Sequence, residues 1–341
     1  MIASDFAPPP RRVFSPWERY VWSVPLYGLG VPLVKVLDAV GLWPRIIAAG
    51  AKQRVGTFGA YEPSAADVFV CAGFKAGTTW MLQIATQIAF RGAAEFANIH
   101  HAVPWPDGPP FLQPHMISLA NPSPRERAPT GLRIIKTHAV QSRVPYSPAA
   151  RYIVVVRDPK DVIVSGYHFL RSLIYGPLMP SVAHWIDLNL GGRLPHGAWA
   201  EHFASYWKVR DRSNILFLTY EETKRDTRAA VARLAGFMGV DLSAAELASV
   251  VQAASFESMK RDWSQFDPGQ VVPWGGRNYM LRKGRAGASG ELLTPRMQDD
   301  IDAKCRADLR ELGCDFPYDA AFGRGRAGRR RDPASPHYAA S

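Results

Sequence analysis

The chain has 341 residues, 47% of them hydrophobic, and a formal net charge of +11 at pH 7. That length is sufficient for a substantial core, and the positive charge favours an anionic ligand. Nucleic acid is not expected as a partner, because the chain has no basic stripe interleaved with aromatic residues and no DNA- or RNA-binding motif. Three cysteines are too few for a disulfide framework, so we predict a reducing, cytoplasmic location.

Residues 1–55 are predicted to form an apolar arm ahead of the main domain. The run from residue 20 to residue 34 carries no charged side chain. We predict no transmembrane span, because this run is shorter than the about 20 residues required and because Pro25 and Pro32 are expected to interrupt a helix. Two interpretations remain for residues 17–47. We favour an arm packed on the main domain; the alternative is a peripheral membrane anchor with headgroup-level tryptophans, namely Trp17, Trp22 and Trp43.

Residues 56–320 alternate short apolar strands with helical stretches, and a basic, disordered tail is predicted over residues 321–341. Strands are predicted over residues 67–73, 132–138, 151–157 and 215–222, and helices over residues 78–90, 160–173 and 227–239. Residues 103–130 are rich in proline and are predicted to be loops. This alternation predicts an α/β fold: a single domain with a central parallel β-sheet flanked by helices. In such sheets, ligands bind at the carboxyl ends of the strands.

The stretch "CAGFKAGTTW" after the first strand predicts an anion-binding loop that resembles a P-loop. Lys75 precedes Gly77, whereas the lysine of the common nucleotide-triphosphate loop follows its second glycine. Backbone N–H groups at the start of the next helix, together with the hydroxyls of Thr78 and Thr79, are suited to binding an anion. An ordinary strand-to-helix turn is the alternative.

A second anion site is predicted at "VVVRDPKDVIVSGYHF". Arg157 ends a strand and Ser165 follows eight residues later on the next helix. Arginine binds phosphate through two parallel hydrogen bonds, although a structural salt bridge with Asp158 or Asp161 is the alternative. Two anion sites together suggest a nucleotide with two phosphorylated positions.

A candidate catalytic pair lies in "RIIKTHAV". Lys136 and His138 are two residues apart at the end of a strand, so both side chains are expected on one face. Histidine is the usual general base near neutral pH. A single histidine is more often structural, and the residues alone leave that interpretation open.

These motifs resemble those of the cytosolic-type sulfotransferases, which use 3′-phosphoadenosine 5′-phosphosulfate (PAPS). From about residue 60 to about residue 318, five segments match in the family's order: "FKAGTTW", "RDPKDVIVSGYHF", "TYEE", "SFESMK" and "RKGRAG". The resemblance implies a phosphosulfate-binding loop, a PAPS donor and no metal. It also implies donor-binding roles for Lys75, Ala76, Gly77, Thr78, Thr79, Trp80, Arg157, Ser165, Tyr220, Ser255, Phe256, Arg282, Lys283 and Gly284.

The resemblance implies sulfuryl transfer to a hydroxyl group by in-line displacement. His138 is expected to be the general base, Lys75 to stabilise the leaving oxygen and Lys136 to neutralise the transferring group. The acceptor is expected to be an apolar alcohol or phenol, either a small molecule or a lipid-like one, that contacts Trp105 and Phe111. Two alternatives remain: a nucleotide kinase with an atypical phosphate loop, and a non-catalytic nucleotide binder or membrane adaptor.

The chain departs from the family pattern at a few positions. Ala254 stands where a threonine is usual, and Ala288 and Ser289 replace an Asp-Trp pair after "RKGRAG". The family's dimer motif is not found before Arg282, so no oligomeric state is predicted.

Overall fold

The computed structural model of the chain describes residues 13–51, 56–110, 115–267, 271–276 and 280–323. Phe111, which was expected to contact the acceptor, lies outside the described residues. So does most of the tail predicted to be disordered, residues 324–341.

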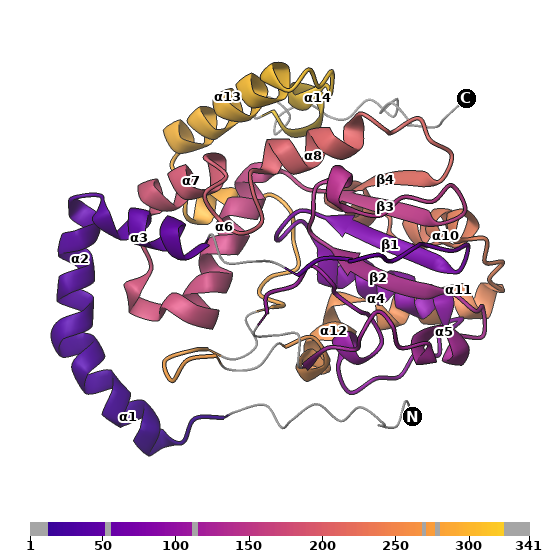
Figure 1. The fold of residues 1–341 in the computed structure, drawn as a ribbon, viewed down its shortest axis with the longest axis horizontal. Helices are drawn as coiled ribbons and strands as arrows, with labels where there is room; N and C mark the ends of the chain where they lie inside the picture. The colour runs from indigo at the N-terminus through magenta and orange to yellow at the C-terminus, as the bar shows by residue number, and fades with distance from the viewer. Residues whose placement is uncertain (1–12, 52–55, 111–114, 268–270, 277–279, 324–341) are drawn as a thin grey trace.

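The centre of the fold is a sheet of four parallel strands in the order β2-β1-β3-β4 (Figure 1). The strands are β1 (Asp67–Ala72), β2 (Arg133–Thr137), β3 (Arg151–Val156) and β4 (Ile215–Thr219). Every residue of β1 is buried, as expected for an apolar strand covered on both faces. The four predicted strands and the parallel sheet are therefore confirmed.

Helices cover both faces of the sheet, so β1 contributes to two cores. Val68, Val70 and Ala72 pack with residues of α4 (Thr78–Ala89), α10 (Thr227–Met238) and α11 (Ala244–Ala253). Phe69 and Cys71 point the other way. They pack with residues of α6 (Pro159–Leu170), α7 (Val182–Leu190), α8 (Trp199–Trp207), α13 (Pro295–Glu311) and α14 (Tyr318–Phe322). The shorter helices are α5 (Ser123–Arg127), α9 (Tyr220–Arg225) and α12 (Phe256–Arg261).

Local sequence signals place the helices that follow the strands. Gly77, with φ of 105°, precedes α4, and Gly239, with φ of 73°, ends α10 as predicted. The Asp158 side chain caps α6 by accepting a hydrogen bond from the Lys160 N–H group, and Pro159 occupies the first helical position. These signals direct the N-termini of α4 and α6 toward the carboxyl edge of the sheet.

The N-terminal arm differs from its predicted form, because its prolines do not interrupt the helix. The helices α1 (Pro16–Pro25) and α2 (Val31–Ala39) are joined by a π-helical turn, Leu26–Gly30, into one helix of 24 residues. A π turn accommodates an irregular hydrogen-bond pattern, and Pro32 directly follows it near the start of α2. The helix is long and apolar enough to cross a membrane by length and composition alone, so the argument from length no longer holds, and the absence of a span stays a prediction.

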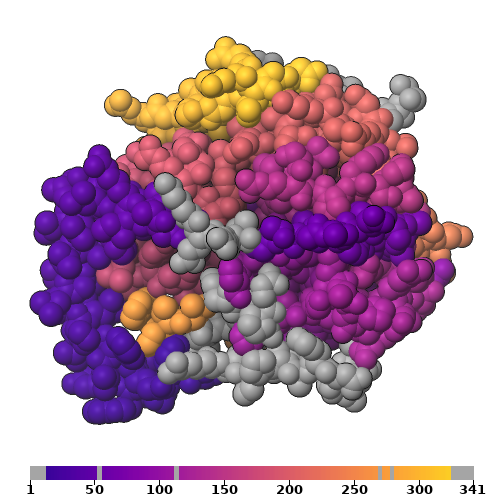
Figure 2. Space-filling model, viewed as in Figure 1, coloured from indigo at the N-terminus to yellow at the C-terminus, as the bar shows by residue number. Residues whose placement is uncertain are grey.

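The arm contacts the domain through a narrow face (Figures 1 and 2). Only 11% of the most apolar part of the helix Pro16–Ala39 is buried. Its C-terminal end is held by Asp38, which accepts hydrogen bonds from the Ser181 N–H group and contacts the ring of His184. The following helix, α3 (Leu42–Ala51), is anchored by a bond from Trp43 Nε1 to the Leu178 carbonyl. The favoured interpretation, an arm packed on the domain, therefore holds for α3 and not for most of the preceding helix.

Candidate active site

A large cavity of about 1190 Å³ lies at the carboxyl ends of the strands. Each strand leads directly to a residue that lines this cavity: Lys75 after β1, His138 after β2, Arg157 after β3 and Tyr220 after β4. A parallel sheet brings these strand ends to one edge, so residues far apart in the sequence meet in one place. The cavity therefore lies at the edge of the sheet where the sequence analysis expected a ligand to bind.

The loop between β1 and α4 requires its glycine. A Cβ atom on Gly77 would lie 2.7 Å from the ring of Tyr220, and φ at this residue is 105°. Lys75 itself adopts a left-handed φ of 60°, and its ammonium group lies 4.0 Å from the centroid of the Phe169 ring. The loop therefore places a cation and the N-terminus of α4 at the same end of the cavity.

Two buried polar atoms at this end fit an anionic ligand. The Thr78 hydroxyl and Arg157 Nε are buried, and neither has a hydrogen-bond partner within the described part of the chain. Buried donors of this kind normally make hydrogen bonds. A ligand with several acceptor oxygens would accept hydrogen bonds from both groups. A phosphate or sulfate group meets that requirement.

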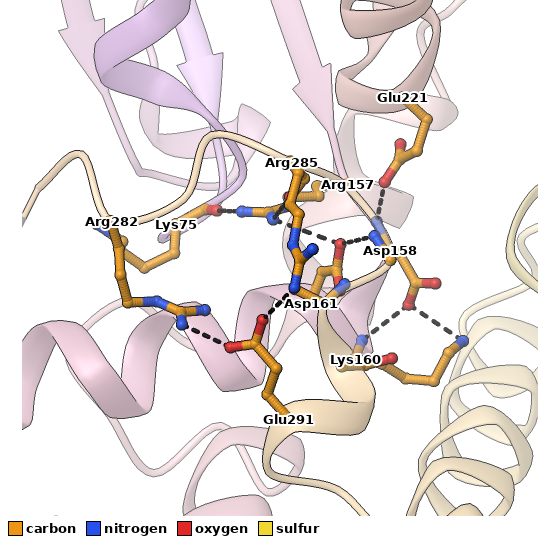
Figure 3. Close-up of polar contacts among 12 residues, drawn as sticks. Lys75, Arg157, Asp158, Lys160, Asp161, Glu221, Arg282, Arg285 and Glu291 are labelled. Carbon is orange, nitrogen blue, oxygen red and sulfur yellow. Dashed lines mark hydrogen bonds and ion pairs between the residues drawn. The ribbon is translucent and has the colours of Figure 1, made fainter. Parts of the chain in front are cut away.

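Arg157 makes one of the salt bridges that the sequence analysis gave as the alternative to phosphate binding (Figure 3). Its guanidinium donates to Asp161 at 3.4 Å and to the carbonyl of Lys75 at 3.3 Å, and it lies 4.4 Å from the centroid of the Tyr220 ring. The other predicted salt-bridge partner, Asp158, pairs with Lys160 instead, at 3.1 Å. Arg157 is therefore held in place by Asp161 while its Nε atom stays available.

The loop of residues 282–285, called the basic loop below, also lines the cavity. Arg282 and Arg285 donate to the carboxylate of Glu291 at 2.6 and 3.0 Å (Figure 3), and Lys283 donates to it at 2.6 Å. These three bonds lower the pKa of Glu291 to about 2. Gly284 has φ of 60°, and a Cβ atom there would lie 2.2 Å from the Phe256 ring, so the loop passes directly over that ring.

The loop is tied to α6 despite its departure from the family sequence. The N–H groups of Gly287 and Ala288 donate to Asp161 at 2.8 and 2.9 Å. These are backbone contacts, so they do not depend on the side chains that replace the usual Asp-Trp pair. The same carboxylate thus connects the loop to Arg157.

Lys136 and His138 come from the carboxyl end of β2, and both line the cavity. The Lys136 ammonium is 3.2 Å from the centroid of the Trp105 ring. Nδ1 of His138 is 2.5 Å from the carbonyl oxygen of Ala72. Because a carbonyl only accepts, Nδ1 carries the proton, and Nε2 retains its lone pair.

Burial sets the charge of these groups in the free protein. It lowers the pKa of Lys75 to about 7, with repulsion from Arg157 acting in the same direction. The pKa of Lys136 is also lowered to about 7, chiefly by burial, while Asp107 opposes the shift. Burial and the nearby Lys136 hold the pKa of His138 well below its usual value, so the imidazole is neutral near pH 7.

Asp107 is a site residue that the sequence did not reveal. Its carboxylate accepts hydrogen bonds from the Thr137 hydroxyl at 2.9 Å and from the His138 N–H group at 2.8 Å. It fixes the backbone from which Lys136 and His138 project. Only its position as an acid within the proline-rich run of residues 104–110 could have drawn attention to it. Phe169, which supports Lys75, was overlooked because one aromatic residue on a helix resembles core packing.

Most of the predicted site residues line this cavity, and two do not. Ala76 is buried beneath the loop, where its N–H group donates to the Gly73 carbonyl, and Ser255 caps α12. The carbonyl of Ala254 accepts from Trp80 Nε1 at 2.8 Å, so the alanine that replaces threonine still fixes the tryptophan. The predicted residues that line the cavity are Lys75, Gly77, Thr78, Thr79, Trp80, Trp105, Lys136, His138, Arg157, Ser165, Tyr220, Phe256, Arg282, Lys283 and Gly284.

Part of the cavity is apolar. It is lined from the arm by Trp43, Ile46 and Ile47, and from the domain by residues that include Phe58, Met116 and Leu170. An apolar ligand portion can be enclosed there, with its polar group toward His138.

The sequence profile of the sulfotransferase domain matches residues 65–313. Human sulfotransferase 1C2 is 31% identical over 59% of this chain and 68% of its own length. The amine sulfotransferase of Oryctolagus cuniculus is 26% identical over 74% of this chain and 84% of its own length.

Solved structures share the fold. Mouse sulfotransferase SULT7A1, complexed with PAP, superposes with a TM-score of 0.58 at 23% identity, over 79% of this chain and 90% of the other. Retinol dehydratase in a complex with retinol and PAP gives a TM-score of 0.60 at 22% identity, over 75% and 84%. Because the family profile covers most of the chain and the strand-end residues carry the family's motifs, the chain belongs to the cytosolic-type sulfotransferase family and is a PAPS-dependent sulfotransferase.

Proposed function

We propose that this enzyme transfers the sulfuryl group of PAPS to the hydroxyl of an apolar alcohol or phenol, with His138 as the general base. One observation carries the proposal. The Ala72 carbonyl accepts a hydrogen bond from Nδ1–H of His138, so Nε2 keeps its lone pair, and His138 lines the same cavity as the anion-binding loop. The related retinol dehydratase has been solved with retinol and with androsterone, both apolar alcohols, which supports an acceptor of this class.

The donor's two anionic ends correspond to two groups of residues. The loop with Lys75 and Thr78 suits the 5′-phosphosulfate, because it combines N–H groups, a hydroxyl and a cation. Arg157, Ser165 and the basic loop with Arg282 suit the 3′-phosphate. The Phe256 and Trp80 rings, which line the cavity between these groups, suit the adenine.

The reaction is an in-line displacement at sulfur. His138 Nε2 takes the proton of the acceptor hydroxyl, and the oxygen forms a bond to sulfur. The bond from sulfur to the bridging oxygen breaks, and adenosine 3′,5′-bisphosphate leaves. Lys75 stabilises the charge that grows on the bridging oxygen, while Lys136 neutralises the transferring oxygens. Positioning and electrostatics therefore supply most of the rate acceleration.

The test is the substitution His138→Ala, measured by steady-state kinetics and by nucleotide titration. Turnover should fall by about 10²–10⁴-fold, the usual contribution of a positioned base. The affinity for adenosine 3′,5′-bisphosphate should be retained, because His138 is expected beside the acceptor. His168→Ala is a matched control, since His168 lines the same cavity near Arg282. Near-normal turnover in His138→Ala would place the base elsewhere.

A further inference from the structure

The exposed apolar side chains of this protein are concentrated in one segment. Of the 15 exposed large hydrophobic residues in the described part of the chain, 13 lie between Val13 and Ile46. Scattered exposed hydrophobics are normal on a soluble protein, but a contiguous patch marks an interaction surface. The arm, drawn in indigo, forms a ridge along one edge of the molecule (Figure 2).

The π-helical turn keeps eight of these 13 side chains in one stripe along the helix, and the exposed Trp22 and Tyr27 lie outside that stripe. Before the turn, the residues of this stripe recur at the three- or four-residue spacing of one face of an α-helix. After the turn, the same spacing resumes. Across the π turn Leu26–Gly30, the last stripe residue before the turn, Val24, and the next one, Leu29, are five residues apart. This separation matches the wider turn of a π helix. The resulting apolar stripe comprises Trp17, Tyr20, Val21, Val24, Leu29, Leu33, Val36 and Val40.

The polar groups of the arm lie away from the stripe. Leu26 and Val34 are buried on the opposite face, and Asp38 on that side contacts Ser181 and His184. The acidic Glu18 is engaged at the helix start, where it accepts from the Ser15 N–H group. The stripe therefore has no acidic group directed along it, while Lys35 and Arg45 are exposed nearby.

The stripe is continuous with the mouth of the cavity. Ile46 is 51% exposed and also lines the cavity, beside Trp43 and Ile47 of the same helix. Ile46 thus belongs both to the exposed apolar surface of the arm and to the lining of the cavity, so α3 connects the two.

We propose that the arm lies in the headgroup region of an anionic bilayer, and that the acceptor is a hydroxylated lipid that enters the cavity from the bilayer past Ile46. This substrate class rests on the proposed sulfuryl transfer. An amphipathic helix with apolar and aromatic residues on one face and exposed lysine and arginine nearby suits such an interface. Contacts at Asp38 and Trp43 fix the C-terminal end of the helix on the domain, which directs the stripe outward along its length.

Binding to vesicles tests the membrane contact without reference to activity. The full chain should co-sediment with phosphatidylcholine vesicles that contain phosphatidylglycerol, and less with phosphatidylcholine alone. The double substitution Leu29→Glu with Leu33→Glu should reduce the vesicle partition coefficient about tenfold or more. The control is Ala245→Glu with Ala248→Glu, which adds the same charge at exposed positions of α11, far from the arm in Figure 1. Equal binding by the two variants would overturn the proposal.

Kinetics separate this inference from the proposed function. The double substitution Leu29→Glu with Leu33→Glu is called the stripe variant. With a long-chain alkylphenol dissolved in the vesicles, its kcat/KM should fall by about the same factor as its binding to vesicles. With phenol in water, the stripe variant should match the wild type, because Leu29 and Leu33 do not line the cavity. Absence of sulfation with any acceptor contradicts the proposed function, whereas efficient phenol sulfation without vesicle binding contradicts only the membrane contact. A dimer that the stripe substitutions dissociate, without vesicle binding, would identify the stripe as a contact between two copies of the chain.

Discussion

Binding of adenosine 3′,5′-bisphosphate should weaken steeply at alkaline pH, because Lys75 enters the complex protonated. Burial and Arg157 lower the pKa of Lys75 to about 7 in the free protein. A bound phosphate oxygen favours the ammonium form and raises that pKa. Above the free pKa, binding must therefore take up a proton.

The size of the effect follows from linkage. At about pH 8 roughly a tenth of the free protein carries a charged Lys75, and each further pH unit reduces that fraction about tenfold. The dissociation constant should rise by the same factor per unit until the pKa in the complex is reached. Glu221, whose pKa burial raises to about 7, is already ionised in this range.

Isothermal titration calorimetry in two buffers of different ionisation enthalpy measures the proton uptake directly. The wild type should take up close to one proton per nucleotide at about pH 8.5, and Lys75→Met should take up about one fewer. Lys136, whose pKa is also about 7, is expected to contribute less, because it faces the transferred group that this nucleotide lacks. An affinity that stays constant over this range, or an equal slope in Lys75→Met, would show that Lys75 remains charged in the free protein.

Three further predictions concern the donor site. Arg157→Ala should weaken binding of the same nucleotide by about 1.5–3 kcal/mol, the usual contribution of a charged hydrogen bond, and an unchanged affinity by calorimetry would make Arg157 a purely structural residue. Gly284→Ala should weaken it as well, because φ is 60° and the new Cβ atom would lie 2.2 Å from Phe256; the melting temperature of the free protein checks that the fold survives. Turnover should survive excess EDTA, since lysines and N–H groups serve the donor in this proposal, and a loss restored by magnesium would favour a kinase.

The parts of the fold that the sequence predicted are those with local causes. The strands were predictable because short, β-branched, apolar runs stop at glycine or at a charged residue, as β1 does before Gly73. The positions of Lys75, Arg157 and His138 at strand ends followed from the same pattern, and the parallel order then brought them to one edge. The family motifs added a role for each of these residues.

Other features depend on contacts between segments that are distant in the sequence. The tautomer of His138 is set by the carbonyl of Ala72, which belongs to a different strand. Asp107 holds the end of β2 from a loop that has no recognisable pattern. Such bonds are visible only once the strands are paired.

The arm illustrates the same limit in a helix. Its composition indicated an apolar segment, but its prolines predicted an interrupted helix, and the π turn at Leu26–Gly30 instead keeps the helix continuous. Composition alone also could not decide which apolar side chains face the domain and which face outward. Only the tertiary structure determined that Trp43, Ile46 and Ile47 line the cavity while the stripe remains exposed, because burial depends on where α3 docks and not on residue type.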